Sequence, residues 1–312
     1  MKQARIIVPV RNGGPRWREA AAALAKVVQD PSMVAVVDSS STDGSAEVAL
    51  EHGFELHRIP VATFNHGRTR QEAITRFCSG CDLVIFLTQD AVVENRETLT
   101  RLLAVFEDKT VGAAYGRQLP HHGARPFEAH AALFNYKPVS ESRSLADLGK
   151  FGHKGAFLSN SFAAYRIASI NQVGGFPSHL ILGEDTYVAM RLLLAGWRIS
   201  YCADACVRHS HDYTLWQEMQ RYFDFGVMHA QTPELLNTFG APEGEGLRFV
   251  MSELRYVRRV APLRIFEVPV RNALKYCGYR LGRAFVRLPN AWRTHLSMTK
   301  GYWSQGAQRA SQ

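Results

Sequence analysis

The stretch 82-DLVIFLTQDA-91 decides the expected fold of this chain. Its five apolar residues, 83–87, stop abruptly at Thr88-Gln89-Asp90. A short apolar run without polar alternation is typical of a strand that is buried on both faces of a parallel sheet. Ligands of open α/β sheets bind outside the carboxyl ends of the strands, so Asp90 is a candidate binding residue. The alternative is that Asp90 only turns the chain or caps a helix that begins near Asn95.

Strand and helix patterns alternate on the N-terminal side of this stretch. The predicted elements are strands at residues 5–10, 33–37 and 54–59, and helices at residues 17–29, 46–52 and 68–77. This alternation with short loops indicates a doubly wound, mostly parallel sheet that is flanked by helices. Right-handed crossovers bring the polar loops 9–14, 38–43 and 88–90 to one edge of such a sheet.

The second half of the chain adds two polar motifs. The elements expected there are strands at residues 111–115, 160–166 and 197–202, helices at residues 95–108 and 215–229, and loops with one helix over the site at residues 116–155. Gly183-Glu184-Asp185 opens a further helix, where the two acids also suit the helix dipole. His209 and His211, at i and i+2 on an expected strand, share a face and can contact one ligand.

Length and composition describe a globular protein. At 312 residues the chain can bury one large core, or one core and an appendage. The hydrophobic content of 46% and the charged content of 21% are ordinary for a folded domain. No run of about 18 apolar residues predicts a transmembrane helix, and the N-terminus enters a strand pattern without the features of a signal peptide. We therefore expect a cytoplasmic protein.

The five cysteines favour reduced thiols, because an odd number does not fit a disulfide framework. A structural zinc site formed by Cys78, Cys81, Cys202 and Cys206 is the alternative that their pairwise spacing leaves open.

Charge and two missing motifs narrow the class of ligand. A net charge of +9 and a pI near 9.5 indicate an anionic partner, which can be nucleic acid, anionic lipid or a phosphorylated substrate. No GxGxxG sequence follows the first strand and no GxxxxGK[ST] sequence occurs. The sheet edge is therefore expected to bind a nucleotide without the dinucleotide or P-loop motif.

Six motifs in this order resemble those of the family 2 inverting glycosyltransferases. They are IIVPVRNGG, VDSSSTDGS, HGRTRQEAI, FLTQDA, VGGF with GED, and VRHSHDYT, from about residue 5 to residue 213. The resemblance implies an α/β protein with the GT-A fold. FNHGRTR, TQDA and HSHDYT look most like a rhamnosyltransferase subgroup that uses dTDP-L-rhamnose in bacterial surface polysaccharide synthesis, which includes lipopolysaccharide O-antigen.

The resemblance implies a donor site at the sheet edge. Asp38 would contact the base or the ribose. The residues that would form the floor of this pocket or face the nucleotide are Pro9, Arg11, Asn12, Arg70, Gln89 and Asp90.

A divalent metal is part of the same expectation. The family's usual Asp-x-Asp motif is Thr88-Gln89-Asp90 here, so one carboxylate remains. Asp90 would bind Mg²⁺ or Mn²⁺ and so help to neutralise the diphosphate that leaves. His211 or His209 would assist the metal or the diphosphate.

Inversion at the anomeric carbon requires a base that takes the proton of the acceptor hydroxyl. By resemblance this base is Asp185, and Glu184 shapes the acceptor pocket. The transition state is expected to be oxocarbenium-like.

The composition changes beyond residue 230. We expect a catalytic domain at residues 1–230, with a nucleotide-binding half to about residue 115 and an acceptor half at about residues 116–230. A helical C-terminal extension is expected at residues 231–312. Basic residues and aromatic residues are interleaved in the extension from Arg248 onward, and residues 233–246 look like a loop. A basic amphipathic segment indicates contact with an anionic membrane surface. The alternative is a helical subdomain that packs on the catalytic core.

Three other functions compete with rhamnosyl transfer. The first keeps the mechanism but uses a UDP-hexose or a UDP-N-acetylhexosamine. The second is a sugar nucleotidyltransferase, for which Arg11-Asn12-Gly13-Gly14 is too short a phosphate loop. The third is a basic nucleic-acid-binding protein, although the chain lacks the motifs of such proteins.

Overall fold

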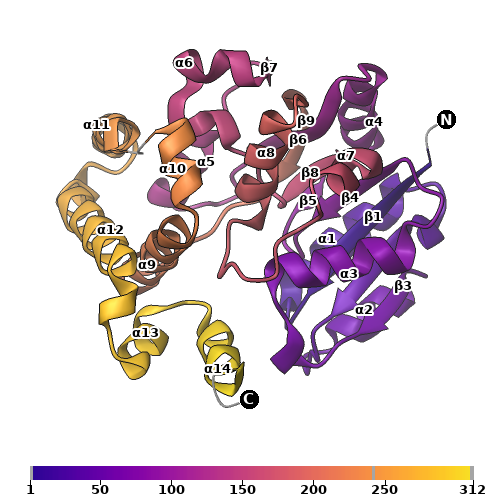
Figure 1. Cartoon of the computed structure of the whole chain (residues 1–312), viewed down its shortest axis with the longest axis horizontal. Coiled ribbons are helices and arrows are strands. Elements are labelled where there is room, and N and C mark those ends of the chain that lie inside the picture. The colour runs from indigo at the N-terminus through magenta and orange to yellow at the C-terminus, as the bar shows by residue number, and fades with distance from the viewer. Residues whose placement is uncertain (1–2, 241–242, 310–312) are drawn as a thin grey trace.

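Nine strands form one sheet in the computed structural model, which describes residues 3–240 and 243–309 (Figure 1). The strands are β1 (Ala4–Val10), β2 (Val34–Asp38), β3 (Glu55–Arg58), β4 (Leu83–Leu87), β5 (Val92–Val93), β6 (Val111–Leu119), β7 (Glu141–Arg143), β8 (Phe162–Arg166) and β9 (Arg198–Arg208). Their spatial order is β3-β2-β1-β4-β8-β6-β9-β5, and β7 pairs with β9. The α/β class and the central position of β4 confirm the sequence-based prediction.

The sheet is mostly parallel, as predicted. Strands β3, β2, β1 and β4 run in one direction, and β6 and β9 are parallel to each other. Strand β8 lies antiparallel between β4 and β6, a reversal that the sequence did not predict. The chain reaches this position from β6 through the connection at residues 120–161. The short strands β5 and β7 are antiparallel to β9.

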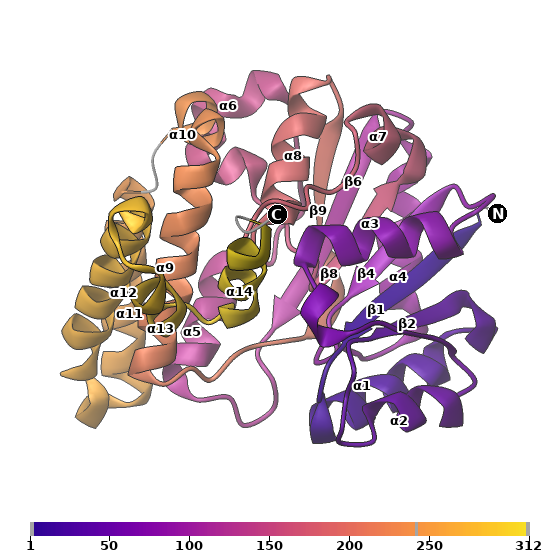
Figure 2. The ribbon, with the colours of Figure 1, turned by 60° about the horizontal axis from the view of Figure 1, so that its bottom comes forward.

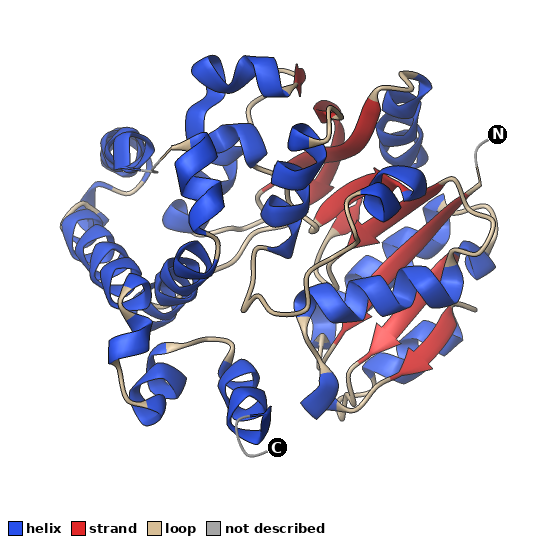
Figure 3. Ribbon diagram, viewed as in Figure 1, coloured by secondary structure: helices blue, strands red, loops and turns tan. Residues whose placement is uncertain are grey.

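Helices cover both faces of this sheet (Figures 1 and 3). The helices of this part of the chain are α1 (Gly14–Val27), α2 (Ser45–Glu51), α3 (His66–Phe77), α4 (Arg96–Ala104), α7 (Ile167–Gln172) and α8 (Glu184–Leu194). Helices α3, α7 and α8 pack on one face, and α1, α2 and α4 pack on the other. In β4, Phe86 belongs to the first core and Ile85 to the second. Alternate side chains of this strand therefore enter two cores, which is why its sequence is continuously apolar.

The carboxyl ends of β1, β2 and β4 meet at one edge, as the parallel pattern predicts. The backbone N–H of Arg11 donates to Oε1 of Gln89 at 2.7 Å, and that of Asn12 donates to the Ser41 hydroxyl at 2.9 Å. The three polar loops are thus connected by hydrogen bonds into one surface.

Two strands are longer than the sequence predicted. Strand β6 continues to Leu119 and β9 to Arg208, and their ladder extends past a register shift at Gly116/Arg117. Gly116 permits this pairing, since a Cβ there would lie 2.3 Å from the ring of Phe162. As a result, His209 and His211 lie in the loop after β9 and not on a strand, which corrects the expected placement.

Helices α5 (Pro126–Asn135) and α6 (Leu148–Phe151) occupy the irregular section between β6 and β8. Further on, α9 (Leu215–Gln231) is followed by α10 (Pro233–Phe239) and α11 (Glu243–Val260), where we expected a loop at residues 233–246. Pro233 occupies the first turn of α10, a position that proline favours, and so starts a helix instead of ending one. Ala241 and Pro242 lie outside the described residues.

The C-terminal extension is helical and is anchored along α9. Helix α12 (Glu267–Arg283) packs so closely that a Cβ at Gly226 would lie 2.3 Å from the Tyr279 carbonyl oxygen, and one at Gly282 would lie 2.0 Å from that of Phe223. Glycine at both positions lets the two backbones approach. Helices α13 (Asn290–Leu296) and α14 (Lys300–Arg309) complete the chain. Figures 1 and 2 show α12 on the side of α9 that faces away from the sheet.

The helices and the cysteines test two expectations, the absence of a transmembrane helix and the possible zinc site. None of the helices within the described ranges combines the length and the hydropathy that a bilayer-spanning segment needs. All five cysteines are free thiols, and no three of them gather at one point in the described part of the chain. The alternative of a four-cysteine zinc site is therefore wrong.

Candidate active site

A cleft of about 360 Å³ begins at the carboxyl ends of β6 and β9 and reaches the C-terminal extension. Asp185 and His211 line it on the catalytic domain, while Phe249 of α11 and Lys275 of α12 form part of its far wall. Helix α5 lines it as well, so the helix expected over the site is present. The extension is thus part of the cleft and not a separate tail.

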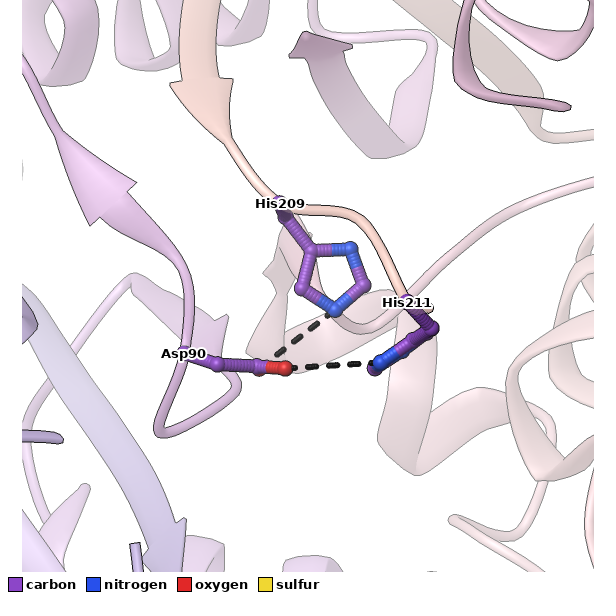
Figure 4. Close-up of side chains that lie close together, drawn as sticks. All are labelled: Asp90, His209 and His211. Atoms are coloured by element: carbon purple, nitrogen blue, oxygen red, sulfur yellow. Dashed lines mark ion pairs between the residues drawn. The ribbon is translucent and has the colours of Figure 1, made fainter. Parts of the chain in front are cut away.

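Asp90, His209 and His211 gather where β4 and β9 end (Figure 4). The Nε2 atom of His209 lies 3.4 Å from Oδ1 of Asp90, and Nδ1 of His211 lies 3.6 Å from Oδ2. The ligand atoms of the three residues lie within 4.8 Å of one another. Two ligand atoms of one small divalent ion lie at most about 4.2 Å apart, so both Asp90–histidine separations are within the range that a shared ion requires.

Gln118 determines which histidine nitrogen faces Asp90. Its amide nitrogen donates to the hydroxyl of Ser159 at 3.0 Å, so its Oε1 faces His209 and accepts from Nδ1 at 2.8 Å. The other nitrogen, Nε2, then presents a lone pair toward the carboxylate and has no hydrogen-bond partner among the described residues. Two acceptors that face each other are stabilised by a cation between them, and an oriented imidazole is usual in metal sites. These residues therefore fit a divalent metal.

The protonation states at this cluster suit the same role. Burial opposes the ionisation of Asp90, but a proton on His209 or His211 beside it holds the pKa of its carboxyl below the usual value. Burial, with His209 nearby, lowers the pKa of His211 to about 3. An ionised carboxylate and a neutral imidazole are the forms that bind a metal.

Asp90 does not cap α4, because the Asn95 side chain accepts the Thr98 N–H at 3.0 Å and fills that position.

Asp185 stands at the start of α8 and borders the same cleft. Its Oδ2 accepts the backbone N–H of Asn160 at 3.1 Å, and its Oδ1 accepts that of Thr186 at 2.8 Å. Burial raises the pKa of its carboxyl to about 6, and the adjacent charge of Glu184 acts in the same direction. A carboxyl with a pKa near neutrality is suited to accept a proton at physiological pH.

Glu184 and Arg70 form a buried ion pair behind Asp185. Oε1 of Glu184 lies 2.9 Å from Nη1 of Arg70 and accepts the Asn160 side-chain amide at 3.0 Å. Burial opposes ionisation of Glu184, but the Arg70 guanidinium lowers the pKa of its carboxyl, so the residue keeps its charge. We expected Arg70 to face the nucleotide. The guanidinium is buried and its Nη1 is engaged by Glu184, so a contact between Arg70 and the nucleotide stays a prediction.

The remaining residues of the expected donor site lie together at the sheet edge. Asp38 is 1% exposed, and its Oδ2 accepts the Ser41 N–H at 3.1 Å. Its other oxygen is buried without a hydrogen-bond partner among the described residues. Pro9 is in register with Val37, one residue before Asp38. Asn12 adopts a left-handed conformation, with φ of 45°, and accepts the Thr42 N–H at 2.8 Å.

Sequence reasoning missed two residues of the site. Gln118 orients His209, and Asn160 binds both acids of the Gly-Glu-Asp motif. Gln118 lay beyond the predicted end of its strand, so no local pattern identified it. Asn160 was placed at the start of a predicted strand, and it reaches the site because β8 runs antiparallel to β4 and β6, a reversal that no local pattern indicated.

A family model described as "Glycosyltransferase like family 2" matches residues 3–223. The chain belongs to this family. The match covers all six motifs that the sequence identified, and it decides against the nucleotidyltransferase alternative. The protein is therefore a glycosyltransferase, as the resemblance of its motifs implied.

Curated relatives and solved structures agree with this assignment. The chain is 44% identical to the O-antigen chain rhamnosyltransferase WbaN of Salmonella anatum, over 97% of this chain and 96% of that protein. It is 40% identical to the O-antigen chain rhamnosyltransferase RfbN of Salmonella typhimurium, over 96% and 95% of the two chains. A mannosyltransferase of Pyrobaculum calidifontis in complex with GDP-Man and Mn²⁺ aligns with a TM-score of 0.56 at 18% identity, over 99% and 86%. S. aureus TarS 1–349 aligns at 0.52 and 18%, over 91% of each chain. These structures confirm the GT-A glycosyltransferase fold.

Proposed function

We propose that this glycosyltransferase moves L-rhamnose from dTDP-L-rhamnose to a glycan acceptor, with inversion, in the synthesis of O-antigen. Two relatives that carry the name rhamnosyltransferase and match nearly the whole chain support the sugar. The observation that carries the mechanism is the cleft itself. It holds His209 and His211 of the Asp90 cluster at one place and Asp185, with its raised pKa, at another.

Asp90, His209 and His211 would hold Mg²⁺ or Mn²⁺. A bound divalent ion neutralises the charge that grows on a departing diphosphate. The buried oxygen of Asp38 would accept a hydrogen bond from the base or the ribose, and the Arg11–Asn12 loop, held by Gln89, would form the floor of the nucleotide pocket. The sheet edge would thus bind and orient the donor.

Asp185 would act on the acceptor side. Its carboxylate takes the proton of the attacking hydroxyl while the new glycosidic bond forms and the bond from the sugar to the diphosphate breaks. Glu184 cannot easily replace it, because Arg70 keeps that carboxyl ionised and buried. The charge of Glu184 in turn raises the proton affinity of Asp185.

The pH dependence of transfer follows from this assignment. Asp185 must be deprotonated to act as the base, and its pKa is about 6. We therefore expect kcat/KM for the acceptor to fall as the pH is lowered through about 6 and to level off above about pH 7. A rate that is constant across this range, in an assay where chemistry limits turnover, would contradict the role of Asp185.

A thermal-shift experiment tests the donor. The panel contains dTDP-L-rhamnose, dTDP, UDP-glucose, UDP-N-acetylglucosamine and GDP-mannose, each with and without Mn²⁺. A ligand that binds only the folded state increases the free energy of unfolding, and so raises Tm. At a ligand concentration of 100 times Kd the increase is about 2.7 kcal/mol. We expect dTDP-L-rhamnose with Mn²⁺ to give the largest shift. A larger shift with a UDP-sugar would replace the donor and keep the mechanism.

We further propose that the catalytic domain, residues 1–230, works at the cytoplasmic face of the inner membrane. The glycan acceptor would be lipid-linked, and the basic extension, residues 231–312, would provide peripheral attachment. The support for this proposal is the charge of the extension and its position in the wall of the cleft.

A further inference from the structure

The turn between α11 and α12 carries the two most exposed large apolar side chains of the described residues. Leu263 lies in the short 3₁₀ turn Pro262–Arg264 and is 94% exposed, and Phe266 precedes α12 and is 81% exposed. We call residues 255–270, the end of α11 and the start of α12, the tip. Monomeric domains seldom leave neighbouring large apolar side chains this open without a partner.

The tip is held in place by packing and by hydrogen bonds. Val257 and Val268, on either side of the turn, are fully buried and pack with Phe127 of α5. Arg264 binds Glu267 through two hydrogen bonds of 2.6 Å and 2.9 Å, and its guanidinium lies over the Phe127 ring at 5.1 Å. The fold therefore buries some apolar residues of the tip and holds Leu263 and Phe266 outward.

Positive charge accompanies these apolar side chains. Arg255, Arg258 and Arg259 are exposed in the last turns of α11, and none of them forms an ion pair with another residue in the described ranges. From residue 268 to residue 312 the sequence contains eight Lys and Arg residues and no Asp or Glu. Along α12 the outward positions continue this mixture with Val270, Tyr276 and Arg280.

We infer that the tip docks on an anionic lipid bilayer, with Leu263 and Phe266 inserted at the level of the headgroups and Arg255, Arg258 and Arg259 on the headgroup phosphates. An apolar point surrounded by arginine is the composition that binds such surfaces, through buried apolar area and attraction to anionic lipid. Nucleic acid would use the arginines, but its phosphate backbone offers no apolar surface, and insertion of Leu263 and Phe266 between bases would cost the energy of unstacking them. The inference deepens the proposed function, because it names the face on which the enzyme meets a lipid-linked acceptor.

The position of the cleft agrees with this orientation. Phe127, which carries the guanidinium of Arg264 on its ring, also lines the cleft, and Arg271 of α12 lies over the same ring at 4.2 Å. One aromatic side chain thus separates the tip from the acceptor side of the cleft. Docking of the tip would therefore bring this wall of the cleft, which Asp185 also lines, toward the membrane surface.

Vesicle sedimentation with the full chain tests the inference without donor or acceptor. The vesicles are phosphatidylcholine alone and an equimolar mixture with phosphatidylglycerol. We expect binding to the anionic vesicles only, weakened at least about tenfold in Arg258→Gln/Arg259→Gln, because one basic residue at an anionic surface contributes about fivefold. Leu263→Ser/Phe266→Ser should weaken binding to a similar extent, and added salt should affect this variant as it affects the wild type.

Matched variants on other surfaces serve as controls. Lys26→Gln/Arg96→Gln removes two exposed charges, and Leu50→Ser/Val139→Ser removes two exposed apolar side chains. Both should bind vesicles as the wild type does, and all four variants should keep the wild-type Tm. Equal losses in tip and control variants would overturn the inference. So would retention on DNA without vesicle binding, or a dimer in sedimentation velocity that Leu263→Ser/Phe266→Ser abolishes. The thermal shift with dTDP-L-rhamnose does not involve the tip. The donor assignment can therefore fail while vesicle binding succeeds, and the reverse.

Discussion

Asp185→Asn is expected to lower kcat for glycosyl transfer by about a thousandfold and to leave donor binding unchanged. A positioned base contributes about 10² to 10⁴ in rate, and the asparagine amide cannot accept the hydroxyl proton. The raised pKa of Asp185 shows that its charge is disfavoured in the fold, by burial first and then by Glu184. Asparagine removes this charge but can accept only one of the two backbone N–H groups that Asp185 accepts, so the two effects on the Tm oppose each other. The measurements are single-turnover transfer to acceptor, and the thermal shift with donor and Mn²⁺.

The control is Asp204→Asn, which removes an exposed carboxylate of β9 outside the cleft. It should transfer at the wild-type rate. Normal turnover in Asp185→Asn would exclude this residue as the base. An equal loss of donor binding and of transfer would instead make it part of the donor site.

Asp90→Asn is expected to weaken Mn²⁺ binding by at least about 100-fold and to lower transfer by a comparable factor at limiting metal. Asp90 is the single carboxylate of the cluster with His209 and His211, and those neutral imidazoles alone cannot balance a divalent charge. Even partners that only orient metal ligands cost about 10- to 100-fold in affinity when they are lost, and a ligand should cost more. Titration of the Tm with Mn²⁺ measures the affinity directly.

Asp82→Asn is the matched control, since it alters an exposed aspartate at the opposite end of β4. Its response to Mn²⁺ should equal that of the wild type. If Asp90→Asn kept the full Mn²⁺-dependent shift, the metal would have to bind elsewhere. If the wild type showed neither a shift with Mn²⁺ nor a metal requirement in transfer, the cluster would act on the diphosphate directly through His209 and His211.

The extent of successful prediction differs between the sheet edge and the cleft. The sheet edge was predictable, because parallel strands with right-handed crossovers place all their carboxyl ends together. Arg11 and Gln89 are joined there by a hydrogen bond, although 78 residues separate them. The partner of Arg70 was not predictable in this way. Its helix was recognised, but the direction of its side chain depends on α8, and there the guanidinium meets Glu184.

The sequence by itself determined the alternation of strands and helices, the buried strand that ends at Asp90, and the chemical groups available to the cleft. Periodicity and strand ends are local properties, so they can be recognised without the fold. Only the tertiary structure decided which groups meet. His209 obtains its orientation from Gln118, 91 residues away, because β6 and β9 pair beyond their predicted ends. The C-terminal helices form a wall of the cleft because glycines let α12 approach α9. Such contacts depend on packing between distant segments, which no local pattern encodes.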